Sequence, residues 1–434
     1  MTEIEYPRFR WIALLAMGVA AGATIANVVA PATLIPEIAR RTGISMGAAA
    51  LGTMGTLDLS TGSSALIGGF LADRFGFGRV WLVCFAMMIA GALLMPLCGD
   101  SFGGLAALRL LQGFGAGPVV ATLPMGAMRW FPARDRGIVI GVQGTMVSLS
   151  AAGTMLFVPA MFQRSGDWSH ALAWVALFSL AGLLAALVMA FGPQPPADPH
   201  APDARGRHGA PPSRGEMGRV LRLPATLAAI ACGFLFTWQQ RAFNDMVPAF
   251  LASDPPAGLG HGPLGAGVMM SAVQVAFMIG PLLGGVLTDR VFRGSARVLI
   301  AGCFALSGAA AAALLLPAVQ HDGRLLAATL LACGFAMSIT SPQVMTFIVK
   351  RHPPQIIGKL GGILMACNIV GGLVGVALCA YALHVSNAYT WTLALIAAAP
   401  LLGVFAALFL VGPAPPAARA ARAAPQAAPQ PTPR

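Results

Sequence analysis

Charged residues are scarce in this chain. Only 10% of its 434 residues are Asp, Glu, Lys or Arg, while 57% are hydrophobic. Soluble proteins carry about 25% charged residues, and no water-soluble fold could cover so much apolar surface. We therefore expect lipid to be the solvent for most of the chain. The formal net charge of +12 comes from basic residues scattered through short loops, which argues against nucleic-acid binding and favours contact with anionic lipid headgroups.

Motifs for catalysis and cofactor binding are also lacking. The chain has no Gly-x-x-x-x-Gly-Lys-Ser/Thr nucleotide loop and no cluster of His, Cys and Glu with metal-ligand spacing. Its seven cysteines lie in or at the ends of apolar runs, without Cys-x-x-Cys spacing, and are interpreted as packing residues. The sequence thus predicts no enzyme, no metal site and no cofactor.

Long apolar runs dominate instead. A helix needs about 20 apolar residues to cross a bilayer, and twelve runs of about that length follow one another. They lie at residues 10–35, 47–69, 80–98, 104–128, 137–162, 170–191, 224–250, 264–287, 297–317, 325–349, 358–383 and 389–411. We therefore predict an all-α polytopic membrane protein with twelve transmembrane helices.

The hydrophilic segment 193–222 divides these runs into two sets of six. It is rich in Pro, Arg, Asp and His, which predicts a flexible cytoplasmic linker between bundles at 1–192 and 223–412. The Ala-Pro-Gln-rich tail at 413–434 is expected to be disordered.

The distribution of basic residues predicts the orientation. If the N-terminus is cytoplasmic, 21 of the 27 basic residues lie on the inner side, four on the outer side and two within apolar runs. This asymmetry predicts that both termini are cytoplasmic. Because the basic residues are almost all arginine and alanine is abundant, we expect a bacterial inner membrane.

The two halves repeat each other. Residues 68–74 recur at 284–290 with five of seven identical, and Asn27-x-x-x-Pro31 recurs as Asn244-x-x-x-Pro248. Such a repeat predicts two six-helix bundles related by a pseudo-twofold axis along the membrane normal, with a solute site near the midplane between them.

The charged turn at 68–80 carries a family resemblance. Gly69, Asp73, Arg74 and Gly76 match the signature loop between helices 2 and 3 of the major facilitator superfamily. Likewise, the stretch Arg-Leu-Leu-Gln-Gly-Phe-Gly at 109–115 resembles the helix-4 motif of that superfamily. The resemblance implies a transporter that works by alternating access.

The resemblance also implies a gating role for the turn. Asp73 would latch the cytoplasmic ends together in the outward-open state, with Arg134, Arg136 or the start of helix 11 near Gly358 as its partner. The alternative is a charged turn that only sets topology. Arg79 is a single, displaced basic residue where the family has two.

The second copy of the turn departs further from the motif. Asp289 and Arg290 are the candidate gating residues there, but Phe292 stands at the position of the matching glycine.

Two ionisable residues are candidates for coupling. Asp58 lies about halfway along helix 2, and we interpret it as the only acid so central, either a proton carrier or a hydrogen-bonded structural acid. Arg109 is its candidate partner. The alternative for Arg109 is a side chain that snorkels to the outer surface.

Helix 7 presents candidate substrate contacts. Arg241 and Asn244 share one face, which Trp238 flanks. In the superfamily that this chain resembles, helices 1, 4, 7 and 10 line the cavity, so Arg241 is a candidate for binding a substrate anion. The alternative is an ion pair with Asp245 or Asp58.

Polar amides at membrane depth complete the predicted site. Asn27, Gln143, Gln343 and Asn368 either line the pathway or bond helix to helix. Asn27 and Asn244 have a further alternative, since each precedes a proline and can bond to backbone carbonyls freed by the kink.

Together these features predict proton-coupled uptake of a small organic anion or similar metabolite by a monomer, with the proton gradient as energy source. Helix 5 reads Ser-Leu-Ser-Ala-Ala-Gly-Thr at 148–154 and lacks the Gly-Pro-x-x-Gly-Gly motif common in drug exporters of the superfamily. Proton-driven efflux of drugs or metabolites is the first alternative. A transporter-like membrane sensor ranks last, because the linker is too short to hold a signalling domain.

Overall fold

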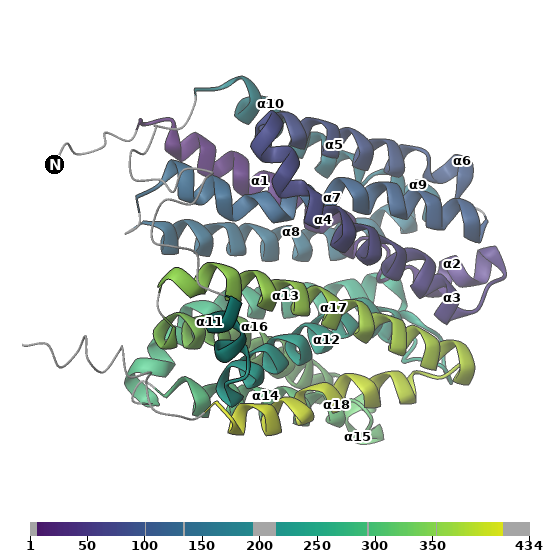
Figure 1. The fold of residues 1–434 in the computed structure, drawn as a ribbon. Helices are drawn as coiled ribbons and strands as arrows, with labels where there is room; N and C mark the ends of the chain where they lie inside the picture. Colours follow the sequence, from purple (N-terminus) through teal and green to yellow (C-terminus); the bar gives the residue numbers. More distant parts are fainter. Residues whose placement is uncertain are drawn as a thin grey trace, which may run out of the picture.

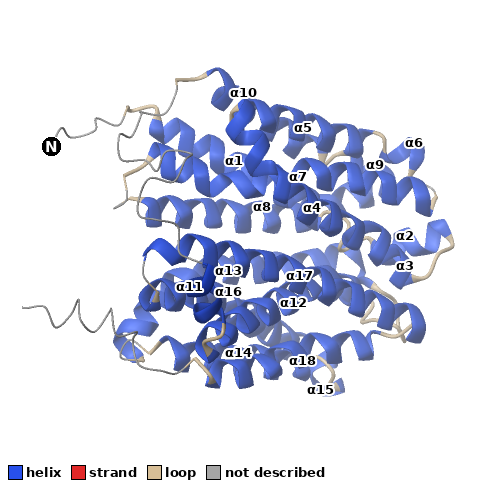
Figure 2. Ribbon diagram, in the orientation of Figure 1, coloured by secondary structure: helices blue, strands red, loops and turns tan. Residues whose placement is uncertain are grey.

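The computed structural model describes residues 7–99, 101–132, 135–193, 214–292, 295–352 and 354–410. Every regular element in these residues is a helix (Figure 2). The predicted all-α fold class is therefore confirmed, and the predicted disordered tail at 413–434 lies outside the described residues.

The first half of the chain forms the upper bundle in Figure 1. Its elements are α1 (Arg10–Val29), α2 (Ile35–Thr42), α3 (Met46–Ala50), the π-helix η1 (Leu51–Gly55), α4 (Thr56–Phe75), α5 (Phe77–Leu93), α6 (Met95–Cys98), α7 (Phe102–Trp130), α8 (Arg136–Ser165), α9 (Trp168–Ala173) and α10 (Ala176–Phe191).

The second half forms the lower bundle. Its elements are α11 (Arg214–Leu221), α12 (Pro224–Ala252), α13 (Gly262–Val286), the π-helix η2 (Leu287–Val291), α14 (Ala296–Ala313), α15 (Pro317–His321), α16 (Gly323–Arg351), α17 (Pro354–Ser386) and α18 (Tyr389–Leu408).

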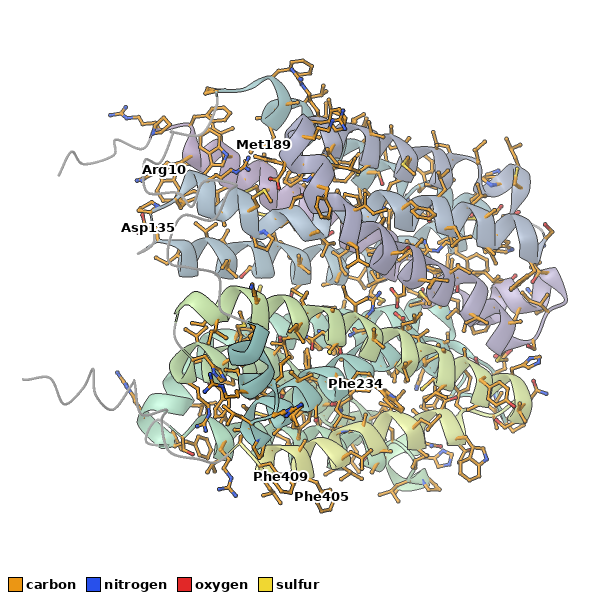
Figure 3. The ribbon with its side chains drawn as sticks, in the orientation of Figure 1. Arg10, Asp135, Met189, Phe234, Phe405 and Phe409 are labelled. Carbon is orange, nitrogen blue, oxygen red and sulfur yellow. The ribbon has the colours of Figure 1, made fainter. Side chains whose placement is uncertain are left out.

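Each of the twelve predicted apolar runs contains a helix. Among the described residues, nine helices are long and apolar enough to cross a membrane. The second, third and seventh runs are not among them: α4 carries Asp58, Asp73 and Arg74, α5 has 17 residues, and α12 carries Arg241 and Asp245. Phe405 on α18 and Phe409 directly after it point outward from the lower bundle (Figure 3). Each is 64% exposed, as expected for side chains that face lipid.

Two boundaries differ from prediction. The first run was predicted to continue to residue 35, but α1 ends at Val29, because Pro31 has no N–H to extend the helical ladder. Part of the segment predicted as a flexible linker, 193–222, is helical, since Arg214–Leu221 forms α11. Met217, Val220 and Leu221 pack against the hydrophobic core, so apolar burial stabilises this short helix.

The helices define two ends of the molecule. We call the end where α1 begins and α11 lies the near end, and the end with α2, α3, α6 and α15 the far end (Figure 1). At the near end of the upper bundle, the rings of Phe9 and Trp130 pack at a tilt of 48° with their centroids 5.4 Å apart.

The two bundles meet at the far end. Ser45, which caps α3, shares a 2.6 Å hydrogen bond with Nδ1 of His384 on α17. The Met46 sulfur accepts from Ser253 and Tyr389 at 3.8 Å. These contacts join the start of α3 to the far ends of α12, α17 and α18.

The hydrophobic cores also show that the bundles contact each other at the far end. The largest core contains far-end residues of the upper bundle together with residues from the whole lower bundle, for example Leu34 and Phe243. The near-end core of the upper bundle is a separate cluster around Trp81 and Trp130. Apolar packing therefore holds the bundles together at the far end, while their near ends keep separate cores.

Gly47 makes the far-end contact possible. A Cβ atom there would overlap the carbonyl oxygen of Ala380 and the backbone of His384. Overpacking of this kind costs about 1–3 kcal/mol. We expect Gly47→Ala to destabilise the closed far end and to increase the population in which it is open, measured as longer distances between spin labels at residues 41 and 387.

Gly103→Ala is the matched control, because a Cβ at Gly103 would meet no atom within 4 Å. An unchanged distance distribution in Gly47→Ala would show that this contact does not limit closure.

Candidate functional site

An ion pair joins the two bundles. Arg241 on α12 donates through Nε to Oδ2 of Asp58 on α4 at 3.2 Å, and its Nη2 contacts the other carboxylate oxygen. Such a forked, charge-assisted pair fixes the position of both groups. The Asp58 side chain is 7% exposed and the Arg241 side chain 25% exposed, so the guanidinium is the accessible member.

Arg109 on α7 binds backbone rather than a carboxylate. Its Nε donates to the carbonyl of Thr53 at 2.8 Å, and its Nη1 donates to the carbonyl of Asn27 at 2.9 Å and to Oε1 of Gln112 at 2.7 Å. Its Nη2 lies 3.4 Å from the carbonyl of Val28. The side chain is 2% exposed, so it does not snorkel to the surface.

The local folding of two other helices supplies these acceptors. Asn27 and Val28 lie in the last turn of α1, where carbonyls have no helical partner and the dipole is negative. Thr53 lies in η1, where the π-helical turn departs from the α-helical ladder. Arg109 on α7 therefore holds α1 and η1 against α7.

The predicted pairing of Asp58 with Arg109 is wrong in this structure. Asp58 binds Arg241 instead, which is the alternative considered for Arg241. Asp58 and Arg109 were expected to lie at similar depths along neighbouring helices. The packing of the lower bundle instead brings Arg241 to Asp58.

Asp245 is a buried acid that sequence reasoning undervalued. It is 1% exposed, and neither carboxylate oxygen has a hydrogen-bond partner. The charges of Arg241 and Arg109 both act on it. Asp58 is therefore not the only central acid. In the sequence, Asp245 lies four residues after Arg241 within one apolar run, and this position could have identified it as a second buried acid.

The predicted amides mostly bond within their own bundle. Asn27 donates to the carbonyl of Ala23 at 2.9 Å and to the Ser179 hydroxyl at 2.8 Å. Asn244 donates to the carbonyl of Gln240 at 2.8 Å and accepts from Gln274 on α13 at 2.7 Å.

The other predicted contacts are also partly or fully buried. Gln143 donates to the sulfur of Met17 at 3.6 Å, and Gln343 is buried beside Gly284. With its amide nitrogen turned toward α12, Asn368 donates to the carbonyls of Gly233 and Leu364 at 3.1 Å.

Trp238 packs against Gly375 on α17, and its indole nitrogen is buried without a hydrogen-bond partner. Of the predicted substrate contacts, Arg241 is the one whose charged group lies between the bundles and remains partly exposed.

The glycines of the helix-4 motif allow close helix contact. A Cβ at Gly113 would overlap the Ser60 hydroxyl, and one at Gly117 would overlap the Ser64 hydroxyl. The Ser64 hydroxyl donates to the carbonyl of Gly113 at 3.2 Å. This packing sets α4 against α7 and so positions Asp58 and Arg109.

The first signature turn lies at the near end. Asp73 is 58% exposed and pairs at 3.5 Å with Arg129 on α7 of its own bundle. Gly76 adopts φ +82°, a conformation that favours glycine. Arg74 lies over the ring of Phe75 at 5.4 Å.

The remaining predicted gating residues that the structure describes in both turns lie at the surface or line a cavity. Gly69 faces open space, since a Cβ there would meet no atom within 4 Å. Arg79 and Arg129 line a cavity of about 240 Å³. Arg290 in the second turn is exposed.

Several predicted gating positions lie outside the described residues. Arg134 is not described at all. The side chains of Arg136 and Asp289 and the surroundings of Gly358 are not described either. Their roles remain predictions.

Loss of Arg109 should destabilise the protein. Arg109→Met leaves three backbone carbonyls without a donor, and each unsatisfied buried acceptor costs about 1–3 kcal/mol. We expect a loss of about 3–5 kcal/mol, measured by denaturant unfolding of purified protein. Arg324→Met, at an exposed arginine on α16, should change stability by less than about 0.5 kcal/mol. Equal effects in both variants would contradict a structural role for Arg109.

Comparisons with known proteins agree with this arrangement. A sequence profile of the Major Facilitator Superfamily matches residues 11–375 and 243–433. The probable nitrate/nitrite transporter NarK2 of Mycobacterium tuberculosis is 26% identical over 321 residues, covering 71% of this chain and 73% of the relative. The hexuronate transporter of Bacillus subtilis is 24% identical over 360 residues, covering 80% and 81%.

A further relative and a solved structure extend the comparison. The probable sulfoacetate transporter SauU of Cupriavidus necator is 22% identical over 361 residues, covering 80% of this chain and 81% of the relative. A bacterial homologue of the human lysosomal transporter Spinster, in an inward-facing and occupied conformation, superposes with a TM-score of 0.70 at 15% identity, covering 94% of this chain and 97% of that one. The profile covers well over half of the residues, and the fold is that of its members: this chain belongs to the major facilitator superfamily of membrane transporters.

Proposed function

We propose that this transporter takes up a small organic anion together with protons. The observation that carries the proposal is the Asp58–Arg241 pair between the bundles. A guanidinium that already binds one carboxylate through a fork has the geometry to bind another. A substrate carboxylate or sulfonate would take the place of Asp58.

The relatives support the anionic substrate class. Three of them are named as transporters of nitrate or nitrite, of sulfoacetate and of hexuronate, all of which are anions. An accessible cation at the bundle interface is the feature of this chain that fits such substrates.

The closed far end corresponds, in this proposal, to the exterior side of a bacterial inner membrane. Both termini are then cytoplasmic, as the excess of basic residues on that side supports. Separate near-end cores fit a state that is open to the cytoplasm. The Asp73 turn pairs within its own bundle here and would form its latch after the near ends close. The proposed working unit is a monomer surrounded by lipid.

Direction and coupling can be tested in proteoliposomes. We expect labelled glucuronate, sulfoacetate or nitrate to accumulate when the pH outside is lower than the pH inside, with the protein oriented as in the cell. Accumulation driven only by the opposite gradient would support the alternative, proton-driven efflux. No uptake of any of these anions under either gradient would contradict the proposal.

Arg241 should distinguish charged from neutral substrates. We expect Arg241→Gln, made together with Asp58→Asn so that no unpaired charge is left, to weaken glucuronate binding about 10- to 100-fold. This corresponds to the loss of about 1.5–3 kcal/mol for a hydrogen bond to a charged group. Binding is measured by calorimetry, and glucose serves as the neutral counterpart.

Asp58→Asn alone is the comparison variant. It leaves Arg241 without a carboxylate partner, so it should bind glucuronate at least as tightly as the unmodified protein. Equal losses for glucuronate and glucose in the double variant would remove the anion argument.

A further inference from the structure

Asp245 is a carboxylate with an unusual environment. It is 1% exposed, lies on α12 one turn beyond Arg241, and both of its oxygens are buried without a hydrogen-bond partner. A buried carboxylate is normally paired or accepts several hydrogen bonds, because its ionised form is costly to desolvate. The ionised form of Asp245 receives neither kind of contact.

Two cations act on Asp245 from a distance. One is Arg241 on its own helix and the other is Arg109 on α7. The described donors of Arg241 are directed to Asp58, and those of Arg109 to carbonyl and amide oxygens. Asp245 is thus held near both guanidinium groups without binding either.

Among the described residues, the other ionisable groups packed near α12 include the Cys333 thiol on α16, which accepts from Gln239, and His352, which shares a hydrogen bond with Thr226. On α17 the Cys379 thiol lies within electrostatic range of Asp245. On α18, Tyr389 binds Ser253, eight residues beyond Asp245. On α13, Gln274 is neutral and binds Asn244.

The charged groups of α2 lie apart from Asp245. Glu37 pairs with Arg40 and Arg41, so these three residues form a separate group at the far end with a net charge of +1. Among the described residues, Asp58, Arg109, Arg241 and Asp245 form a charged cluster on α4, α7 and α12, and its Asp58–Arg241 pair joins the bundles.

This cluster has no net charge when all four side chains are ionised. A proton on Asp245 raises its net charge to +1, and a bound monoanion returns it to zero. In a medium of low dielectric constant, charge balance of this kind makes the binding of the proton and the anion mutually favourable.

We propose that Asp245 is the proton-binding residue that couples transport, and that one proton on it accompanies each monovalent anion held by Arg241. The proposal rests on the function proposed above. The proton enters from the more acidic side, binds one Oδ of Asp245 and leaves as the departing anion exposes the unbalanced positive charge. No bond other than this O–H forms or breaks.

Asp245→Asn is the direct test. It mimics the protonated side chain permanently, so labelled glucuronate should still exchange across proteoliposomes with unlabelled glucuronate, within about threefold of the unmodified rate. Accumulation driven by a pH gradient should fall at least about tenfold, and exchange should lose its pH dependence. A purely structural acid would not separate exchange from accumulation.

Asp254→Asn is the matched control, since it makes the same chemical change at an exposed residue just beyond α12. It should keep both accumulation and pH dependence. Asp245→Glu preserves a titratable group and should keep pH-driven accumulation with a shifted pH midpoint, which also provides a test if Asp245→Asn does not fold.

Proton uptake by the unmodified protein gives a measurement without variants. In weakly buffered solution we expect about one proton bound per glucuronate. Retained pH-driven accumulation in Asp245→Asn, or anion binding without proton uptake, would overturn the role of Asp245. Failure of the unmodified protein to accumulate any tested anion would instead overturn the proposed function.

Discussion

The pairing of charge inside a lipid-facing protein is the constraint on which the rest of this structure depends. Asp58, Arg109, Arg241 and Asp245 lie at membrane depth, where isolated charges are costly. The structure compensates three of them with direct contacts: Asp58 binds Arg241 across the bundle interface, and Arg109 binds carbonyl oxygens. Asp245 is left without such contacts, and this difference makes it the group whose protonation the cluster can most readily accommodate.

Irregular backbone and small residues make these contacts possible. The end of α1 before Pro31 and the π-turn η1 leave carbonyls that Arg109 binds. Gly113 allows α4 to approach α7 closely, and Gly47 does the same for α3 and α17 at the far end. Since apolar surfaces gain little by leaving lipid for one another, close packing and hydrogen bonds carry most of the association energy between helices. The glycines therefore determine where the charged groups meet.

The two bundles share a hydrophobic core at the far end and have separate cores at the near end, and the ion pair joins the bundles within this asymmetric contact. The far-end core contains residues from both bundles, while the near-end core of the upper bundle is separate. Asp58 and Arg241 lie on helices of different bundles, so a solute that replaces Asp58, as proposed, would bind where the two bundles contact each other. A binding site there affects the conformational equilibrium through its differential contacts in the two states. This is the physical link between the proposed anion site and alternating access.

Sequence patterns were sufficient for the helical class, the twofold repeat and the family, because apolar runs of membrane length and the turn at 68–80 are local features. They also identified Asp58, Arg109 and Arg241 as the costly charges, since any ionisable residue within such a run needs compensation. They left the partners open: the pair of Arg241 with Asp58 was only an alternative, and Arg109 was the expected partner of Asp58. Asp58 binds Arg241, which is 183 residues away in sequence, Arg109 binds carbonyls freed where α1 ends, and Asp245 has no partner. Periodicity assigns a residue to a depth and a helix face, but the packing of two bundles alone decides which faces meet.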